Sequence, residues 1–193
     1  MKNNFFAVIS RMKYINRWAL MRNTIQENLS EHTLETAYIA HVLALMKNKR
    51  HNGNVNPERC ALLAMYHDCT EIITGDLPTP IKYYNPEIRD AYGEIEENAK
   101  NKLLSYLPDD LKDEYEPLFV PTQEEEELWK LVKAADKISA LIKCIDESNM
   151  GNNDFIRAES STLQAIHNLN CTEAEEFLLE FLPAYGLTLD EQA

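Results

Sequence analysis

One stretch in the second half of the chain constrains the fold more than any other. Between Glu124 and Glu147, apolar side chains recur at steps of three and four, which places them on one face of an α-helix. The stretch opens with four consecutive glutamates, whose charge suits the positive end of a helix dipole. The sequence therefore predicts a long helix with these residues against a core: Leu128, Leu131, Ala135, Ile138, Ile142 and Ile145.

Helical patterns also dominate the rest of the chain. With 5 Gly and 8 Pro in 193 residues, the sequence is poor in turn-formers, and internal repeats and low-complexity tracts are absent apart from the glutamate run. We therefore expect an all-α helical bundle in a single domain over residues 1–193. The predicted helices are Phe5–Tyr14, Glu31–Lys49, Glu58–Ile73, 86–106, a short one after Pro108, 154–168 and 172–182.

Three local signals set the expected ends of these helices. Ser30 is a good N-cap for the helix in which Leu34, Tyr38 and Leu45 recur at helical spacing. Asn56 followed by Pro57 is typical of a helix start. The segment from Gly75 to Pro80 cannot continue a helix, because its two prolines lack backbone donors and restrict the residue before each. We expect it to be a rigid loop.

Charge argues against binding to a nucleic-acid polymer. The chain carries 19 Lys plus Arg against 32 Asp plus Glu, a formal net charge of −13, which repels a polyphosphate backbone. Residues 1–50 are the exception, with eight basic and three acidic side chains. A small anion could therefore still bind near the N-terminus.

Cysteine spacing and hydropathy point to the cytoplasm. Four scattered cysteines form no Cys-x-x-Cys pair, which disfavours a zinc ribbon or a disulfide framework. The first residues mix apolar and basic side chains without the apolar core of a signal peptide, and no run approaches the roughly 20 apolar residues of a membrane helix. We expect a cytoplasmic protein without membrane association.

Ionisable residues in otherwise apolar helices mark the candidate site. His67, Asp68 and Glu71 lie within one turn of each other, so they can converge on one rim of a helix end. His32 begins another helix, and Asp136 interrupts the apolar face of the long one. Taken singly, His32 could be a packing residue and Asp136 half of a surface ion pair. Together they suggest a cation or a proton transfer, because unpaired burial is costly.

This order of His, His-Asp and Asp, each on its own helix, resembles the HD superfamily of metal-dependent phosphohydrolases. Longer motifs are similar to the bacterial HD-domain 5′-deoxynucleotidases, the YfbR-like family, over essentially the whole chain. The similar segments are Ile15–Trp18, Ser30–His32, Leu63–Asp68, Glu71, Thr74–Pro80 and Gly151–Asn153.

The resemblance implies an HD-domain helical bundle that removes the 5′-phosphate of deoxyribonucleoside monophosphates. It implies one divalent cation, with Co²⁺ or Mn²⁺ first among the candidates, held by four ligands. Such a set leaves open positions for a water and a phosphate oxygen. The implied metal ligands are His32, His67, Asp68 and Asp136.

The resemblance also implies roles around the cation. Glu71, with Asp68, would be catalytic, Glu71 handling the proton of the attacking water or of the leaving 5′-oxygen. Arg17 would clamp the phosphate, because a guanidinium offers paired donors and keeps its charge. Trp18 would lie against the sugar and exclude a 2′-hydroxyl. Further substrate contacts would come from His32, Asp68, Asp76, Leu77, Pro78, Thr79 and Asp136.

Plainer interpretations and other functions remain open on the sequence alone. Arg17 could be a surface residue, Trp18 a core anchor and Asp76 an ordinary turn residue. The metal site could instead serve a phosphodiesterase or a nucleoside triphosphate hydrolase, or the domain could be a catalytically silent nucleotide-binding module. By the resemblance, the expected partners are a deoxyribonucleoside 5′-monophosphate and a second copy of the chain, as a homodimer.

Overall fold

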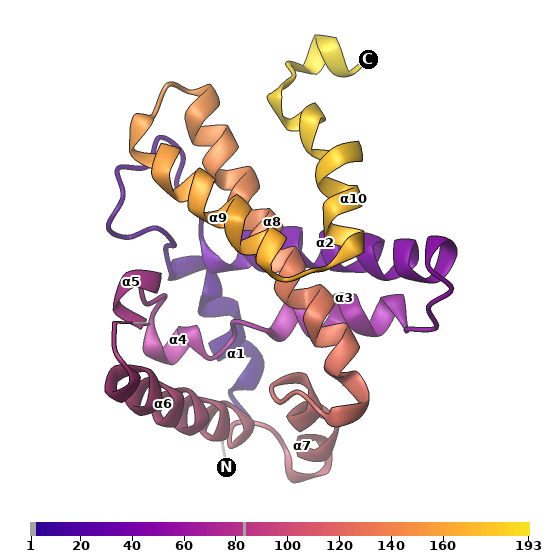
Figure 1. Ribbon diagram of the computed structural model, residues 1–193. Coiled ribbons are helices and arrows are strands. Elements are labelled where there is room, and N and C mark those ends of the chain that lie inside the picture. Colours follow the sequence, from indigo (N-terminus) through magenta and orange to yellow (C-terminus); the bar gives the residue numbers. More distant parts are fainter. Residues whose placement is uncertain (1–2, 83) are drawn as a thin grey trace.

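Helices make up the regular structure of the protein. The computed structural model describes residues 3–82 and 84–193, with the backbone alone at Thr79 and Pro80 (Figure 1). Within these ranges every named element is a helix, and the one β-type pairing is an isolated antiparallel bridge between Asn16 and Asn28. The all-α prediction is confirmed.

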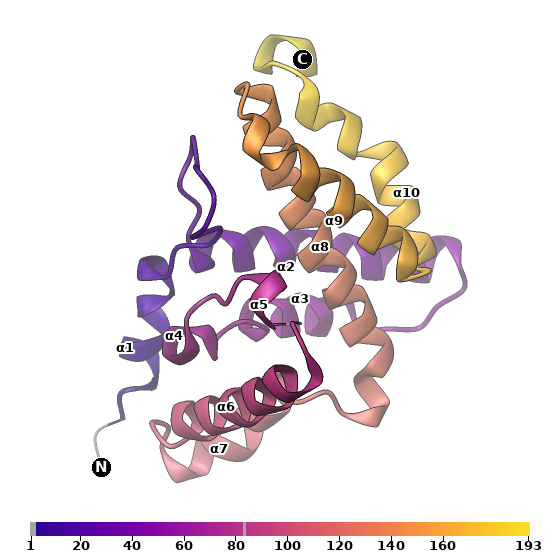
Figure 2. The same ribbon diagram turned by 60° about the vertical axis from the view of Figure 1, so that its left-hand side comes forward.

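Three helices form the centre of the molecule. α2 (Leu29–Arg50) and α3 (Pro57–Tyr66) lie side by side, and α8 (Glu126–Asn149) crosses both (Figures 1 and 2). α9 (Ile156–Asn168) packs along α8, and α10 (Thr172–Glu180) contacts α2, α8 and α9. The apolar face predicted for the long helix is confirmed, since its members either are buried in this core or, at Ile145, pack against it.

A second, smaller apolar cluster lies on the N-terminal side. α1 (Phe5–Ile9) leads into the 3-10 helix Ser10–Tyr14. α1 contacts α6 (Pro86–Leu104), and Met12 of the 3-10 helix is buried in the same cluster as Leu103 and Leu104 of α6. Tyr66 packs against both clusters and joins them. The remaining elements are α4 (Glu71–Thr74), α5 (Thr79–Lys82), α7 (Asp109–Tyr115) and the 3-10 helices Glu116–Leu118, Gln123–Glu125, Asn153–Phe155, Leu182–Gly186 and Leu189–Gln192.

The start of α2 differs from the prediction. Asn28, not Ser30, is the N-cap: its side chain accepts hydrogen bonds from the backbone of Ser30 (3.0 Å) and Glu31 (3.2 Å). The Glu31 carboxylate accepts in return from the Asn28 backbone at 3.0 Å, which completes a capping box. The reciprocal pair satisfies two helix-end donors, so the helix begins two residues earlier than Glu31.

The apolar residues predicted at helical spacing on α2 are divided between its two sides, with Ala37 buried and three larger residues facing outward. Leu34, Tyr38 and Leu45 are 46, 67 and 36% exposed, although the helical spacing that identified the helix is real. The buried side of α2 consists largely of small and β-branched residues, such as Thr36 and Ala40, which let α3 and α8 approach closely. Both faces of this helix therefore carry apolar residues.

The predicted helix Glu58–Ile73 is interrupted. Asn56 caps α3 by accepting from the Arg59 backbone at 2.8 Å, with Pro57 at the first position, as predicted. α3 ends at Tyr66, however, and a turn over residues 67–70 precedes α4. The break redirects the chain at His67 and Asp68, the residues of greatest chemical interest.

The segment Gly75–Pro80 is only partly a loop. α4 ends as predicted, and Gly75 has φ of 75°, a left-handed conformation that glycine adopts without strain. Thr79 then begins α5, with Pro80 at its second position, where the helix makes no use of a backbone N–H and the missing donor of proline costs nothing. Tyr92 of α6 fixes this region by donating a hydrogen bond from its hydroxyl to Thr74 Oγ1 at 3.2 Å.

Two further expectations concern the cysteines and the membrane. Cys60, Cys69, Cys144 and Cys171 are all buried free thiols, and burial raises the pKa of Cys60 and of Cys144 to about 12. Across residues 3–82 and 84–193, no helix combines the length and hydropathy needed to cross a membrane.

Candidate metal centre and active site

Four predicted residues meet where α2, α3 and α8 come together. His32 belongs to α2, His67 and Asp68 to the turn after α3, and Asp136 to α8. One ligand atom from each can be chosen so that all lie within 4.8 Å of one another. The shortest contacts join His67 Nε2 to Asp68 Oδ2 at 3.1 Å and His32 Nε2 to Asp136 Oδ1 at 3.2 Å.

Both imidazole rings are oriented by a hydrogen bond at Nδ1, the nitrogen that faces away from the carboxylates. His67 Nδ1 lies 2.7 Å from the Ala64 carbonyl oxygen, which can only accept, so Nδ1 carries the proton in this bond. His32 Nδ1 lies 3.0 Å from Ser139 Oγ, and that hydroxyl donates to Glu35 Oε2 at 2.6 Å. When it is deprotonated, each imidazole therefore presents the lone pair of Nε2 to the two carboxylates.

This arrangement fits a cation. Nε2 of His32 and of His67 is buried without a hydrogen-bond partner among the described residues. Two nitrogen lone pairs facing two carboxylates repel one another unless a proton or a metal ion lies between them. Two imidazoles and two carboxylates suit a divalent transition metal, and the bond each histidine makes at Nδ1 supplies the usual support for such a site.

The charge states of the cluster show the same demand for positive charge. Burial alone would lower the pKa of His67, but the carboxylates of Asp68 and Asp136 raise it to about 9. Burial would raise the pKa of Asp68 and of Asp136, yet the two histidines hold both well below the usual range.

Glu71 lies next to the cluster without belonging to it. Its backbone nitrogen donates to the Asp68 carbonyl oxygen at 3.0 Å, which ties the start of α4 to the turn. Its Oε2 is buried without a hydrogen-bond partner among the described residues. Burial, reinforced by the Asp68 and Asp76 carboxylates, raises the pKa of Glu71 to about 9. A carboxyl group in this environment is suited to holding and releasing a proton.

Arg17 is a buried residue of the site and not a surface arginine. Its Nη1 lies 3.6 Å from Asp68 Oδ2, and its Nε donates to Glu27 Oε2 at 3.3 Å. Burial alone would lower the pKa of Arg17, but the carboxylates of Glu27, Asp136 and Asp68 raise it. Arg17 therefore places a fixed positive charge beside Asp68, and Lys137 Nζ lies 3.8 Å from Asp136 Oδ2 on the other side of the cluster.

Trp18 adjoins this arginine in an unusual conformation. Its φ of 58° is rare for a bulky residue, and such strain persists only where the surroundings enforce it. The indole Nε1 donates to Glu27 Oε2 at 2.9 Å, and the ring lies 5.3 Å from that of Phe155, centroid to centroid. Trp18 is half-buried, so it combines an anchored edge with partly accessible surface.

The loop after Gly75 adds Asp76 to this group. Burial raises the pKa of Asp76, opposed by Arg17 and by a hydrogen bond with the Trp18 backbone. The next two residues, Leu77 and Pro78, are half-buried. The Thr79 side chain, also predicted to contact the substrate, lies outside the described part of the chain.

Sequence reasoning missed three supporting residues. Glu35 lies three positions after His32 and Ser139 three after Asp136, so each follows its ligand on the same helix face. That spacing is a readable signal. Glu27, which bonds both Arg17 and Trp18, lies in an irregular segment where no periodicity points to it.

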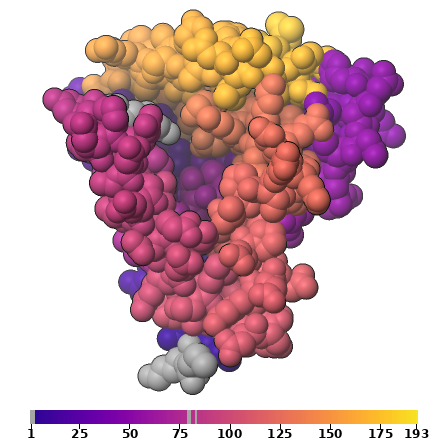
Figure 3. Space-filling model, turned by 60° about the horizontal axis from the view of Figure 1, so that its bottom comes forward, coloured from indigo at the N-terminus to yellow at the C-terminus, as the bar shows by residue number. Residues whose placement is uncertain are grey.

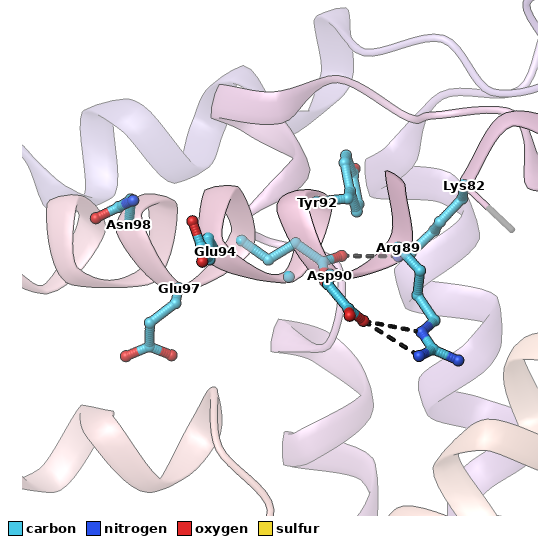
Figure 4. Close-up of a pocket in the computed structure, with 9 residues that line it drawn as sticks. Lys82, Arg89, Asp90, Tyr92, Glu94, Glu97 and Asn98 are labelled. Atoms are coloured by element: carbon cyan, nitrogen blue, oxygen red, sulfur yellow. Dashed lines mark hydrogen bonds and ion pairs between the residues drawn. The ribbon is translucent and has the colours of Figure 1, made fainter. Parts of the chain in front are cut away.

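The surface is hollowed beside α6. In Figure 3 a depression opens between α6 and the α7–α8 side, with purple atoms from the α2 part of the chain at its floor. A cavity of about 920 Å³ is lined by α6 residues and Lys82. Figure 4 shows Arg89 paired with Asp90 there, and no lining residue belongs to the His–Asp cluster. The chemistry, rather than cavity size, identifies the site.

Comparison with known proteins agrees with this chemistry. The sequence model of the 5′-deoxynucleotidase YfbR-like family matches residues 4–185. The chain belongs to this family. Among YfbR-like relatives, the 5′-deoxynucleotidase of Vibrio parahaemolyticus is 48% identical over 190 residues, which is 98% of each chain. The one from Photorhabdus temperata is 48% identical over 189 residues, covering 98% of this chain and 96% of its own.

Solved structures show where the YfbR-like fold belongs. An HD-domain phosphohydrolase from Listeria innocua superposes with a TM-score of 0.83 at 24% identity, covering 98% of this chain and 91% of that one. The HD phosphohydrolase DatZ of cyanophage S-2L, solved with dA and one catalytic Zn²⁺, gives 0.65 at 20% identity, covering 94% and 96%. These likenesses establish the HD-domain fold.

Proposed function

We propose that this protein is a metal-dependent 5′-deoxynucleotidase, hydrolysing deoxyribonucleoside 5′-monophosphates to deoxyribonucleosides and phosphate. The observation that carries the proposal is the cluster of two lone-pair-bearing histidines and two carboxylates with a buried arginine beside it. The names of full-length relatives at 48% identity support the same reaction.

His32, His67, Asp68 and Asp136 would hold one divalent cation. When bound, a divalent cation supplies Lewis-acid chemistry: it acidifies a water and neutralises charge on a phosphate. The protein contributes a buried, oriented donor set, in which the Nδ1 bonds of both histidines fix which nitrogen faces the cation.

Arg17 binds the phosphate in this proposal. Its Nε is occupied by Glu27, which leaves its terminal nitrogens on the side of Asp68. A guanidinium offers phosphate two parallel donors and keeps its charge throughout the reaction. Arg17 would therefore hold the phosphate next to the metal cluster.

Glu71 manages a proton. The leaving 5′-oxygen needs a proton as its bond to phosphorus breaks, and the attacking water must lose one. The buried, unpartnered Oε2 of Glu71, three residues from Asp68, is the available group for either transfer. We assign it proton donation to the 5′-oxygen; the carboxylate that remains takes up the proton lost by the attacking water, so that Glu71 ends the reaction in the state in which it began. Asp68 would contribute as one of the four metal-holding residues.

Trp18 and Asp76 would recognise the sugar. The half-buried indole, locked by Glu27, would fill the space that a 2′-hydroxyl needs and so select deoxyribose over ribose. Asp76 would accept a hydrogen bond from the 3′-hydroxyl, with Leu77, Pro78 and Thr79 lining the sugar or base. The deoxyadenosine bound by the DatZ neighbour supports a deoxynucleoside pocket in this fold.

Three finer predictions accompany the proposal. Co²⁺ and Mn²⁺ are the favoured cations, although the Zn²⁺ of DatZ shows that this fold also accommodates zinc. A homodimer and a cytoplasmic location are expected from the family resemblance and from the free cysteines, respectively.

Phosphate release, together with chromatographic analysis of the products, over a panel of substrates tests the proposal. The metal-loaded protein is assayed with deoxyribonucleoside mono- and triphosphates and a cyclic dinucleotide, with EDTA as the control. We expect phosphate from the monophosphates alone, and none in EDTA. Preferred cleavage of the triphosphate or of the phosphodiester would assign the site to another HD-type reaction, and binding without any cleavage would indicate a silent module.

A further inference from the structure

Two carboxylates outside the metal cluster contact the side chains that form the site. We propose that they divide its support: Glu27 positions the arginine and tryptophan that face the substrate, while Glu35, through a serine, positions one metal-binding histidine. The substrate half rests on the proposed function, whereas the metal half rests on the cluster alone. Both carboxylates line one cavity of about 240 Å³, whose lining includes none of the four cluster residues.

Glu27 joins the two substrate-facing residues through a single oxygen. Its Oε2 accepts from Trp18 Nε1 at 2.9 Å and from Arg17 Nε at 3.3 Å. Its backbone carbonyl also accepts from the Arg17 nitrogen at 3.0 Å. Glu27 therefore fixes the direction of the guanidinium and of the indole together, and it supplies the countercharge that a buried arginine requires.

Glu35 acts on the metal cluster through two consecutive hydrogen bonds whose directions are fixed. An ionised carboxylate only accepts, so the Ser139 hydroxyl proton points to Glu35. Ser139 Oγ must then accept from His32 Nδ1, which keeps the proton off Nε2. Ser139 is fully buried, so bulk water does not compete for its two hydrogen bonds. Glu35 thereby selects the tautomer of His32 that can bind a metal.

Glu27 and Glu35 line the same cavity but share no hydrogen-bond partner, and neither supports the second histidine. Glu27 Oε1 lies 4.0 Å from His32 Nδ1, beyond hydrogen-bond distance, so Glu27 does not replace the serine. His67 is held by the Ala64 backbone carbonyl, which a side-chain substitution does not remove. Removing Glu27 should thus disturb the substrate side, and removing Ser139 the metal side.

The experiment measures two quantities on the full-length protein and its variants. Calorimetric titration of the metal-free protein with Mn²⁺ gives the metal affinity. Steady-state kinetics at saturating Mn²⁺ give KM and the ratio of kcat/KM for dAMP over AMP. The matched control is Asp146→Asn. The Asp146 carboxylate lines the same cavity but is not hydrogen-bonded to Arg17, Trp18 or Ser139, so its replacement removes one negative charge and none of the proposed contacts.

We expect Ser139→Ala to weaken Mn²⁺ binding about 10- to 100-fold, the usual effect of losing a partner of a metal-bound histidine, with the dAMP to AMP ratio unchanged. Glu35→Ala should weaken it similarly, and Glu35→Gln less, because an amide oxygen still accepts from Ser139. Glu27→Ala should leave Mn²⁺ affinity within about twofold, raise KM for dAMP about tenfold or more, and lower the ratio. Glu27→Gln should recover part of both effects.

The proposal is overturned if Ser139→Ala binds Mn²⁺ like the Asp146→Asn control, or if Glu27→Ala matches that control in KM and ratio. Equal shifts of both quantities in both folded variants would also overturn it, because they would show that Glu27 and Ser139 do not support separate parts of the site. The Gln variants preserve volume and hydrogen bonding, so they decide the question if the Ala variants do not fold. A wild type that cleaves no monophosphate defeats the proposed function, while the Mn²⁺ titrations still test the role of Glu35.

Discussion

His32 Nε2 lies 3.2 Å from Asp136 Oδ1, although the histidine belongs to α2 and the aspartate to α8. The histidine is fully buried, and its Nε2 has no hydrogen-bond partner among the described residues. The crossing of two core helices thus creates a pair that is stable only with a positive charge between its members. Cation binding and the packing of the bundle are therefore linked.

Replacement of Asp136 should remove most of the stabilisation that a bound metal ion gives to the folded protein. In the wild type, a cation at 100 times its dissociation constant adds about 2.7 kcal/mol to the free energy of unfolding. Asp136→Asn removes one charged ligand, so most of the rise in Tm on adding Mn²⁺ should disappear. Thermal unfolding with and without Mn²⁺ measures this, with Asp146→Asn as the control for charge. An undiminished shift would mean that the metal binds elsewhere.

Glu71→Gln should abolish turnover and spare the metal. The amide cannot exchange the proton that the reaction needs, so kcat should fall about 10²- to 10⁴-fold. Because Glu71 is not one of the four cluster residues, Mn²⁺ affinity should change little. Steady-state measurement of kcat and calorimetric titration with Mn²⁺ separate the effect on turnover from the effect on metal affinity. If the metal is lost as well, Glu71 is a ligand and its assignment here is wrong.

Trp18→Ala should weaken the discrimination against ribose. The smaller side chain opens the space assigned to the 2′-position, so the ratio of kcat/KM for dAMP over AMP should narrow. Trp129→Phe is the matched control, because this second tryptophan lies in α8 and packs against the main core. If the ratio of kcat/KM for dAMP over AMP is unchanged in Trp18→Ala, the indole does not select the sugar and serves only to pack against Phe155.

Glu147 should stabilise the fold in a pH-dependent way. Burial alone would raise its pKa, but Lys143, Asn152 and the backbone amides of Thr24 and Ile25 hold that pKa far below the ordinary range. A carboxylate with a depressed folded-state pKa stabilises the protein above its unfolded pKa of about 4.3, and this contribution is lost as the pH falls.

Glu147→Gln should therefore reduce the free energy of unfolding at pH 7 by about 3 kcal/mol, because it leaves Lys143 unpaired. The difference from wild type should shrink as the pH drops below about 4. Urea unfolding at pH 7 and in acid checks both points. Glu180→Gln, which breaks an exposed pair with Arg50, should change stability little at either pH. A pH-independent difference would refute the charge argument.

The sequence predicts the long helix and singles out the four residues that the fold brings together, for physical reasons. Apolar spacing in α8 extends over about five turns, and ionisable residues within apolar helices stand out because burial must be compensated. It predicts local breaks less well. Tertiary contacts decide that α3 ends at Tyr66, and the capping box of Asn28 outcompetes Ser30 as the start of α2.

Support for the site is harder to predict than the site itself. Glu35 and Ser139 meet only because α2 and α8 cross, and nothing in the local sequence of Glu27 shows that its side chain reaches Arg17 and Trp18. The outward face of α2 is a similar case. Helical spacing identified Tyr38 as part of a stripe, but the packing of α3 and α8 determines which face is buried.

The most direct test of the proposed activity compares two substrates that differ by one hydroxyl. Phosphate release from dAMP and from AMP is measured in EDTA and after addition of Co²⁺, Mn²⁺ or Mg²⁺. For a metal-dependent 5′-deoxynucleotidase we expect no release in EDTA, recovery with a divalent transition metal, and a higher kcat/KM for dAMP than for AMP. Release that persists in EDTA, or equal hydrolysis of the two nucleotides, would contradict the proposed activity.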